Sequence, residues 1–122
     1  MKKTILIVDD EEVTLTLTSG ILSAQYDVYR ALSAHEAIEM YDRFRPQMIL
    51  SDLLMPEMNG FEMVKILQEK YGRRMPVIFM TASEDEEAEY EGLGLGAVDF
   101  IRKPLKADVL LKSVNKIMEH LS

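Results

Sequence analysis

Short runs of apolar residues alternate along the chain with longer segments whose apolar residues recur at helical spacing. The short runs are rich in Ile, Val and Leu at successive positions, which is typical of strands covered on both faces in a parallel sheet. Each intervening segment is long enough for a helix, so the pattern predicts a (βα)₅ alternation. The predicted strands are Thr4–Val8, Asp27–Ala31 and residues 48–51, 77–80 and 98–101.

The segments between the strands carry helix signals of their own. Val13, Leu17 and Ile21 are spaced by four and predict the buried stripe of a helix over residues 12–24. Residues 33–36 and 83–86 both fit capping boxes that open helices, and the second of these helices is predicted to stop in the glycines at 92–96. The other residues expected to face the core are Ala37, Ile38 and Tyr41, then Phe61, Val64, Ile66 and Leu67, and finally Leu110, Val114, Ile117 and Leu121.

Length and composition narrow the class of protein. The chain of 122 residues is the size of one ordinary domain, so residues 1–122 are expected to form a single α/β domain. A net charge of −7 argues against direct binding of nucleic acid, because an acidic surface repels phosphate backbones. The absence of cysteine excludes thiol catalysis and cysteine metal sites. With neither a signal peptide nor an apolar run long enough for a membrane span, we expect a cytoplasmic protein without membrane contact.

Polar residues follow four of the five predicted strands. Asp9 and Asp10 follow the first strand, Asp52 the third, Thr81 the fourth and Lys103 the fifth. Parallel strands joined by right-handed crossovers end at the same rim of the sheet, where open α/β sheets bind ligands. These side chains are therefore expected to gather at one site. The second strand lacks such a group, as expected if it lies at an edge of the sheet.

The charges of the predicted cluster indicate its chemistry. Two carboxylates ~4 Å apart repel each other by ~4 kcal/mol at an effective dielectric of about 20, so Asp9, Asp10 and Asp52 together call for a cation. Mg²⁺ fits best, because it takes few carboxylates and bridges to phosphate oxygens. Lys103 adds a positive charge and Thr81 a hydroxyl donor. The set suits a phosphoryl group, with Asp52 as the nucleophile.

Structural interpretations of the same residues remain open at this point. Asp9 could be an acid at a helix N-terminus, Asp52 a turn cap and Lys103 a surface lysine. The dipole of a helix does not, however, explain two adjacent aspartates directly after a buried strand. Phe100 could be an ordinary core residue or a ring that moves.

Four motifs together resemble the receiver domain of response regulators, the phosphoacceptor module of two-component and phosphorelay signal transduction. The resemblance covers essentially the whole chain, with the motifs in order and at suitable spacing. It implies a flavodoxin-like, doubly wound sheet of five parallel strands in the order 2-1-3-4-5. The motifs are Val8-Asp9-Asp10, Ser51-Asp52-Leu53-Leu54-Met55-Pro56 with Gly60, Thr81-Ala82, and Phe100 three residues before Lys103-Pro104.

The resemblance implies roles for the residues of the cluster. Asp52 would be phosphorylated in a Mg²⁺-dependent reaction. Asp10, Asp52 and the backbone carbonyl of Leu54 would hold the ion, and Asp9 would act through a water on it. The catalytic role would extend only to phosphorylation and dephosphorylation of the domain itself, so the chain is expected to be a signalling module and not an enzyme acting on other substrates.

The resemblance also implies a conformational switch. Lys103 would pair with the phosphoryl group, and its bond to Pro104 would be cis. Thr81 would rotate towards the phosphoryl oxygens, and Phe100 would turn inward to fill the space that Thr81 leaves. The fourth helix, fifth strand and fifth helix would carry the change to partners. Because Phe100 lacks the hydroxyl of tyrosine, no phenolic hydrogen bond could stabilise its inward position.

The implied partners are a histidine kinase or phosphotransfer protein as donor, and a downstream effector or a fused output domain as target. The sequence leaves open a phosphorylation-dependent homodimer and a role as the amino-terminal piece of a longer regulator. A phosphorylation-independent scaffold would typically lack one of the acidic pair, the acceptor or the lysine, all of which are present. A haloacid-dehalogenase-like hydrolase needs a second aspartate two residues after the nucleophile, where this chain has Leu54. A flavin-binding protein would leave the aspartates unexplained.

Overall fold

The computed structural model describes residues 2–82 and 86–121 and shows five parallel strands in one sheet, in the order β2-β1-β3-β4-β5. This confirms the predicted fold class, and it places β2 at an edge. The strands are β1 (Thr4–Val8), β2 (Asp27–Ala31), β3 (Met48–Asp52), β4 (Val77–Thr81) and β5 (Asp99–Arg102). The helices are α1 (Glu12–Leu22), α2 (Ala34–Phe44), α3 (Gly60–Tyr71), α4 (Glu86–Gly94) and α5 (Ala107–Glu119).

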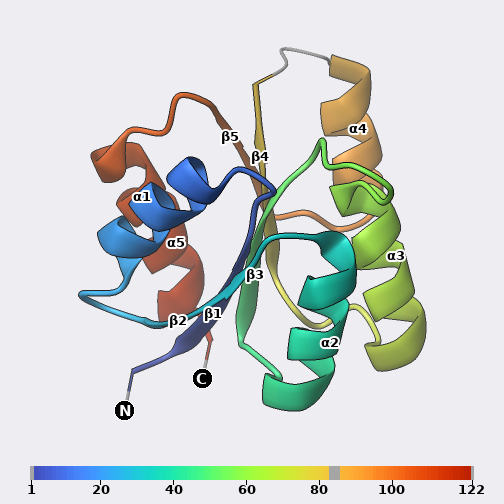
Figure 1. Cartoon of the computed structure of the whole chain (residues 1–122), viewed down its shortest axis with the longest axis horizontal. Helices are drawn as coiled ribbons and strands as arrows, with labels where there is room; N and C mark the ends of the chain where they lie inside the picture. The colour runs from blue at the N-terminus through green and yellow to red at the C-terminus, as the bar shows by residue number, and fades with distance from the viewer. Residues whose placement is uncertain (1, 83–85, 122) are drawn as a thin grey trace.

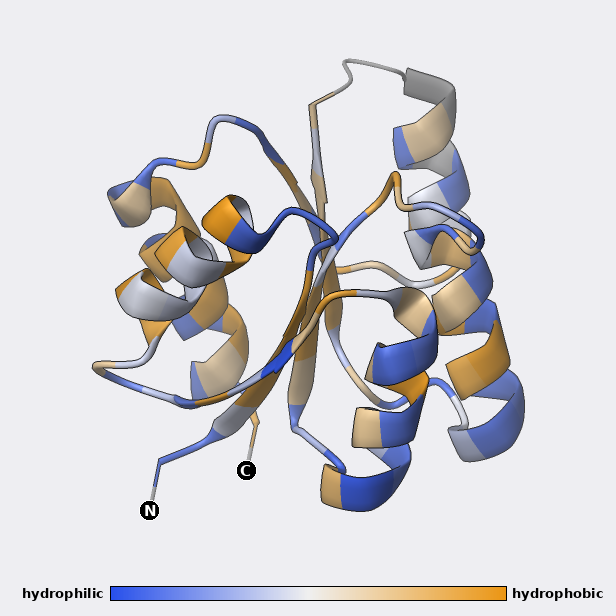
Figure 2. Ribbon diagram, in the orientation of Figure 1, coloured by the Kyte–Doolittle hydropathy of each residue, from blue (hydrophilic) through white to orange (hydrophobic). Residues whose placement is uncertain are grey.

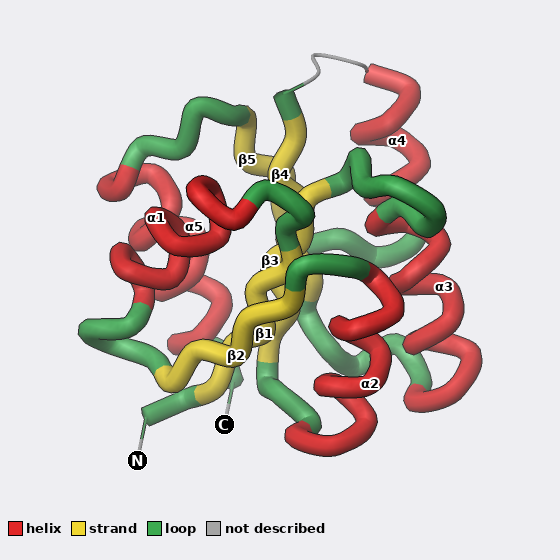
Figure 3. Tube along the Cα trace, viewed as in Figure 1, coloured by secondary structure: helices red, strands yellow, loops and turns green. Residues whose placement is uncertain are grey.

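Helices cover both faces of the sheet. α1 and α5 lie on one face, and α2, α3 and α4 on the other (Figures 1 and 3). Successive residues of a strand point to opposite faces, and in β1 Leu6 and Val8 join the core under α2 and α3 while Ile5 and Ile7 join the core under α1 and α5. The apolar residues concentrate along the strands and the inner helix faces, and polar residues lie outside (Figure 2).

Burial of the strands depends on their place in the sheet. β3 and β4 are buried at every position and β1 at all but its first residue, as predicted for strands covered on both faces. The edge strands β2 and β5 are each largely exposed or half-buried, because they have a neighbour on one side alone. β5 begins at Asp99, one residue later than predicted, and Val98 is half exposed.

The predicted stripe of α1 is wrong at two of its three positions, whereas Ile21 is half-buried and packs against the core. Val13 and Leu17 are 74% and 64% exposed. Apolar residues alternate along this segment and fit more than one helix face, so packing against the sheet selected another row. Thr18 belongs to that row because its hydroxyl donates a hydrogen bond to the Thr14 carbonyl oxygen (2.8 Å), which satisfies its polar atom inside the helix. The buried residues of α1 are Leu15, Thr18 and Leu22.

The other helices follow the predicted faces more closely. Ile66 is exposed, contrary to prediction, whereas the rest of the predicted α3 stripe is buried. In α5, Met118 is buried, and Ile117 and Leu121 are half-buried. Ser33 is confirmed as the N-cap of α2, and it accepts a hydrogen bond from the Glu36 amide. The capping box predicted at 83–86 begins in residues outside the described part of the chain. The correctly predicted core positions are Ala37 and Tyr41, Phe61, Val64 and Leu67, and Leu110 and Val114.

No helix within residues 2–82 and 86–121 is long and apolar enough to span a membrane.

Candidate functional site

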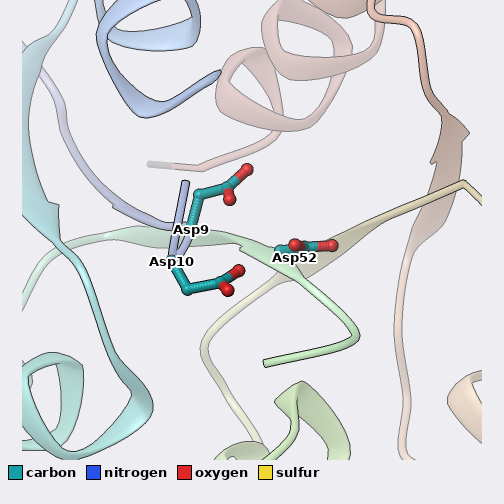
Figure 4. Close-up of side chains that lie close together, drawn as sticks. All are labelled: Asp9, Asp10 and Asp52. Carbon is teal, nitrogen blue, oxygen red and sulfur yellow. The ribbon is translucent and has the colours of Figure 1, made fainter. Parts of the chain in front are cut away.

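Asp9, Asp10 and Asp52 meet at the carboxyl ends of β1 and β3. Val8 pairs with Ser51 in the parallel register of these strands, so the residues that follow lie side by side. One carboxylate oxygen from each aspartate lies within 4.8 Å of the others, and Figure 4 shows the three side chains gathered at the strand ends. The predicted convergence of the three aspartates is confirmed. Their donors are all carboxylate oxygens, which fit a hard divalent cation such as Mg²⁺.

The two neighbouring aspartates differ in how firmly they are held. Asp9 is fully buried, and its Oδ1 accepts a hydrogen bond from the Glu11 amide (2.9 Å) while its Oδ2 accepts one from Lys103 Nζ (3.1 Å). Asp10 is exposed to solvent. Asp9 is therefore fixed in the floor of the site, and Asp10 stands at its open side.

Asp52 is buried at the end of β3 and is fixed from two sides. Its Oδ1 accepts a hydrogen bond from the Leu53 amide (2.9 Å), and its Oδ2 lies 3.2 Å from Lys103 Nζ. Burial raises the pKa of Asp52 above its ordinary value; the ammonium of Lys103 opposes this increase, and the charge of Asp9 adds to it. A cation bound among the three carboxylates would favour the ionised form of Asp52.

Lys103 bridges the aspartates from the far end of the sheet. Its backbone amide donates to the Thr81 carbonyl oxygen (2.8 Å), which continues the β4–β5 pairing, and its peptide bond to Pro104 is cis. Burial disfavours the charge on its ammonium, but the attraction of Asp52 and Asp9 outweighs burial and raises the pKa of Lys103. The side chain is thus held as a cation between two carboxylates that are 43 residues apart in sequence.

Thr81 ends β4, the strand next to β3, and Leu54 follows Asp52 by two residues, whereas Phe100 lies away from this group. Thr81 is buried at the end of β4, and the side chain of Leu54 is 66% exposed in the loop after Asp52. Phe100 pairs with Phe79 within the sheet, below the rim, and its half-buried ring packs into the core under α2 and α3. The structure therefore gathers the predicted chemical residues at one rim and places the predicted switch ring behind them.

The start of α3 supports Asp52 from behind. Gly60 donates its amide to the Leu53 carbonyl oxygen (2.8 Å), and a Cβ at Gly60 would lie 2.7 Å from the Asp52 carbonyl oxygen. Asn59 and Glu62 form a reciprocal capping box, with side chain to amide distances of 2.9 and 3.1 Å. The Asn-x-x-Glu spacing before an apolar stretch was the signal that could have revealed the box.

Comparison with known proteins identifies the family. The profile of the response regulator receiver domain matches residues 5–115, and the chain belongs to this family. Over 118 residues the chain is 34% identical to a probable cyclic di-GMP phosphodiesterase of Vibrio cholerae, with 96% of this chain and 27% of that protein covered. The chain thus spans about a quarter of the length of that relative.

Solved structures agree with this assignment. The chemotaxis protein CheY4 of Vibrio cholerae is 30% identical, with a TM-score of 0.90, and the match covers 96% of this chain and 99% of that chain. A CheY-like receiver domain protein from Methanospirillum hungatei is 28% identical, with a TM-score of 0.90 and coverage of 98% and 95%. Receiver domains are signalling modules of two-component systems that bind Mg²⁺ at an acidic pocket and interact with histidine kinases and output effectors.

Proposed function

We propose that Asp52 accepts a phosphoryl group from a histidine kinase or phosphotransfer protein in a Mg²⁺-dependent reaction. The observation that carries this proposal is the buried carboxylate of Asp52, which has two further carboxylates beside it and Lys103 Nζ 3.2 Å from its Oδ2. An aspartate with only a structural role does not require two further carboxylates and a lysine beside it. A nucleophile that accepts a highly charged group requires them, because the metal they would bind and the lysine stabilise that charge.

The chain supplies the nucleophile and its orientation. A carboxylate oxygen of Asp52 attacks phosphorus, and the bond from phosphorus to the donor histidine nitrogen breaks. No general base is needed, because a carboxylate is already an ionised nucleophile. The hydrogen bond from the Leu53 amide to Oδ1 limits rotation of the carboxylate, so the attacking oxygen has a defined direction.

The remaining residues stabilise the incoming charge. Lys103 lies within reach of the phosphoryl oxygens and neutralises part of their charge, and the Thr81 hydroxyl donates to them after rotating. Asp10, Asp52 and the backbone carbonyl of Leu54 would hold Mg²⁺, with Asp9 contributing through an intervening water. When bound, the ion neutralises developing charge and helps align the phosphoryl group.

The proposal extends to the setting of the domain. Residues 1–122 form one cytoplasmic receiver domain that changes its α4–β5–α5 surface on phosphorylation. It acts through a downstream effector or a fused output domain, and it does not bind nucleic acid directly.

Intact mass spectrometry after incubation with acetyl phosphate tests the proposal. The wild-type chain should gain one phosphoryl group in the presence of Mg²⁺ and none when the metal is chelated. Asp52→Asn should gain none. Asp27→Asn is a matched control, because Asp27 is exposed on β2 and outside the site. Labelling of Asp52→Asn at the wild-type level would contradict the proposal and place the acceptor elsewhere.

A further inference from the structure

Three of the four phenylalanines of the chain lie close together behind the site. The ring centroids of Phe61 in α3 and Phe79 in β4 are 5.0 Å apart, and those of Phe79 and Phe100 in β5 are 5.6 Å apart. The Phe79 ring also lies 3.1 Å from where a Cβ of Gly60 would be, directly behind Asp52. The row of rings thus begins at the acceptor loop and ends at Phe100.

Gly92 of α4 lies against the Phe100 ring. A Cβ at this glycine would lie 2.2 Å from Cζ and 2.5 Å from Cε2 of Phe100, and 3.2 Å from the Phe61 ring. The Phe100 ring therefore occupies the space in which any other residue at 92 would carry its side chain. Gly92 lies within α4 and was predicted only to mark the end of this helix. Gly94, in the same helix, has nothing within 4 Å of its Cβ position.

Among the α4 residues whose side chains the structure describes, few others are buried. In the described part of this helix Gly92 is buried, Ala88 is half-buried and Leu93 is 62% exposed. Its polar contacts include an ion pair between Glu89 and Arg102 of β5 and another between Glu91 and Lys65 (3.8 Å). Exposed ion pairs contribute little to stability, so among the described residues the contact between Phe100 and Gly92 is a principal apolar link between α4 and β5.

We propose that Gly92 is a positioning residue that holds the ring of Phe100 inward before phosphorylation. This inference rests on the proposed function of Asp52 and concerns the regulation of that site. With the ring already placed against α4, the unphosphorylated domain lies nearer to the phosphorylated form than a domain with a side chain at this position. A side chain at 92 either expels the ring or moves α4 away from the sheet, and both outcomes disfavour the ring-inward form.

The ring position is tested first in the protein without phosphoryl donor or Mg²⁺. Nuclear Overhauser contacts should join the Phe100 ring protons to the Gly92 α protons and to the Phe79 ring. Gly92→Ala should unfold at a temperature several degrees lower. It should lose the Phe79–Phe100 contacts if the ring is expelled, or the contacts between Phe100 and residue 92 if α4 moves away. Gly94→Ala is the matched control and should retain these contacts and the unfolding temperature. Wild-type contacts and stability in Gly92→Ala would overturn the proposal.

The same substitution in a Phe100→Ala variant distinguishes the clash with the Phe100 ring from other effects of alanine in α4. In Phe100→Ala the space beside residue 92 is free, so adding Gly92→Ala should cause no further loss of unfolding temperature. If Gly92→Ala lowers the unfolding temperature equally in both backgrounds, the glycine serves another purpose and the proposal fails.

Binding of beryllofluoride, a phosphoryl mimic, tests whether the position of the Phe100 ring affects the phosphorylation site. In the presence of Mg²⁺, Gly92→Ala should bind it with an affinity lower by about tenfold, because less of the protein is in the competent form, and Gly94→Ala should match the wild type. Equal affinities of wild type and Gly92→Ala would overturn the proposal. A wild type without any response would instead contradict the proposed role of Asp52, while loss of the ring contacts in Gly92→Ala would still support the role of Gly92 in placing the ring.

Discussion

α3 and α4 lie on the same face of the sheet but are attached to it by different means (Figure 1). α3 has five buried residues and a reciprocal capping box at its start. Gly92 is the one buried residue in the part of α4 whose side chains the structure describes. Segments with few buried apolar contacts open or shift at lower free energy than well-packed ones. The packing of α3 therefore predicts a rigid helix next to Asp52, and the sparser packing in the described part of α4 predicts a helix that shifts at lower free energy.

The same substitution in the two helices should have very different effects on stability. Leu67 of α3 is fully buried, and Leu67→Ala is expected to lower the free energy of unfolding by about 3 kcal/mol. Leu93 of α4 is 62% exposed, and Leu93→Ala should change it by less than about 0.5 kcal/mol. Urea unfolding followed by circular dichroism measures both. Comparable losses of unfolding free energy in the two variants would contradict the inferred difference in packing between α3 and α4.

A methyl group at the start of α3 should disturb both packing and chemistry. Gly60→Ala places its Cβ 2.7 Å from the Asp52 carbonyl oxygen, a backbone atom that cannot move aside easily. We expect a loss of about 2 kcal/mol in the free energy of unfolding and slower labelling by acetyl phosphate. Gly20→Ala in α1 is the matched control, since nothing lies within 4 Å of its Cβ position, and it should be neutral or slightly stabilising. Wild-type stability in Gly60→Ala would show that the backbone at Asp52 shifts at little cost in free energy.

The ionised carboxylate of Asp52, next to α3, should lower the free energy of unfolding when no cation is bound. The pKa of Asp52 is raised in the folded state, chiefly by burial, so its ionised form disfavours folding above the ordinary pKa of the group. With divalent ions chelated at pH 7, Asp52→Asn should therefore be more stable than the wild type by about 1 kcal/mol.

This advantage has a defined dependence on pH and metal. It should shrink as pH falls through the folded-state pKa and vanish below about pH 4, where the wild-type carboxyl is protonated in both states. Saturating Mg²⁺ should stabilise the wild type more than the variant, because binding to the folded form favours that form. Thermal unfolding at several pH values, with and without Mg²⁺, provides the measurement. A variant less stable than the wild type at pH 7 without metal would mean that the Lys103 pairing outweighs burial.

The smallest effect on stability, and a specific effect on function, is expected at Leu54. Its exposed side chain follows the acceptor by two residues, and we expect it to affect the access of water to the phosphoryl group. Leu54→Asn should change the lifetime of phosphorylated Asp52 severalfold and stability by less than about 0.5 kcal/mol. Loss of the phosphoryl mass with time, after removal of acetyl phosphate, gives the lifetime. Unchanged decay would exclude a role for Leu54 in water access.

Much of the fold and site could be predicted because it depends on local patterns. Each strand was visible as an apolar run, and the parallel orientation of the strands followed from the helices between the runs. The strand order 2-1-3-4-5 came from the resemblance to receiver domains. Asp9, Asp10, Asp52 and Lys103 converge as predicted, because the residues after parallel strands must share one rim. The capping box of Asn59 and Glu62 was also encoded locally, although we did not predict it.

Other features depend on which surfaces meet. Val13 and Leu17 had the spacing of a buried stripe, yet the sheet and α5 accept another row of α1. Lys103 was expected at the site, but its simultaneous contact with Asp9 and Asp52 depends on the position of β5 at the sheet.

The sequence by itself determined the alternation of strands and helices and the polar residues at the strand ends, because both follow from periodicity along a single segment. Only the tertiary structure decided which helix face is buried. It also brought the Phe100 ring into the space that a side chain at residue 92 would need. The contact between Gly92 and Phe100 joins two segments that each look ordinary alone. Its physical reason, two groups that cannot occupy the same space, exists only once the chain has folded.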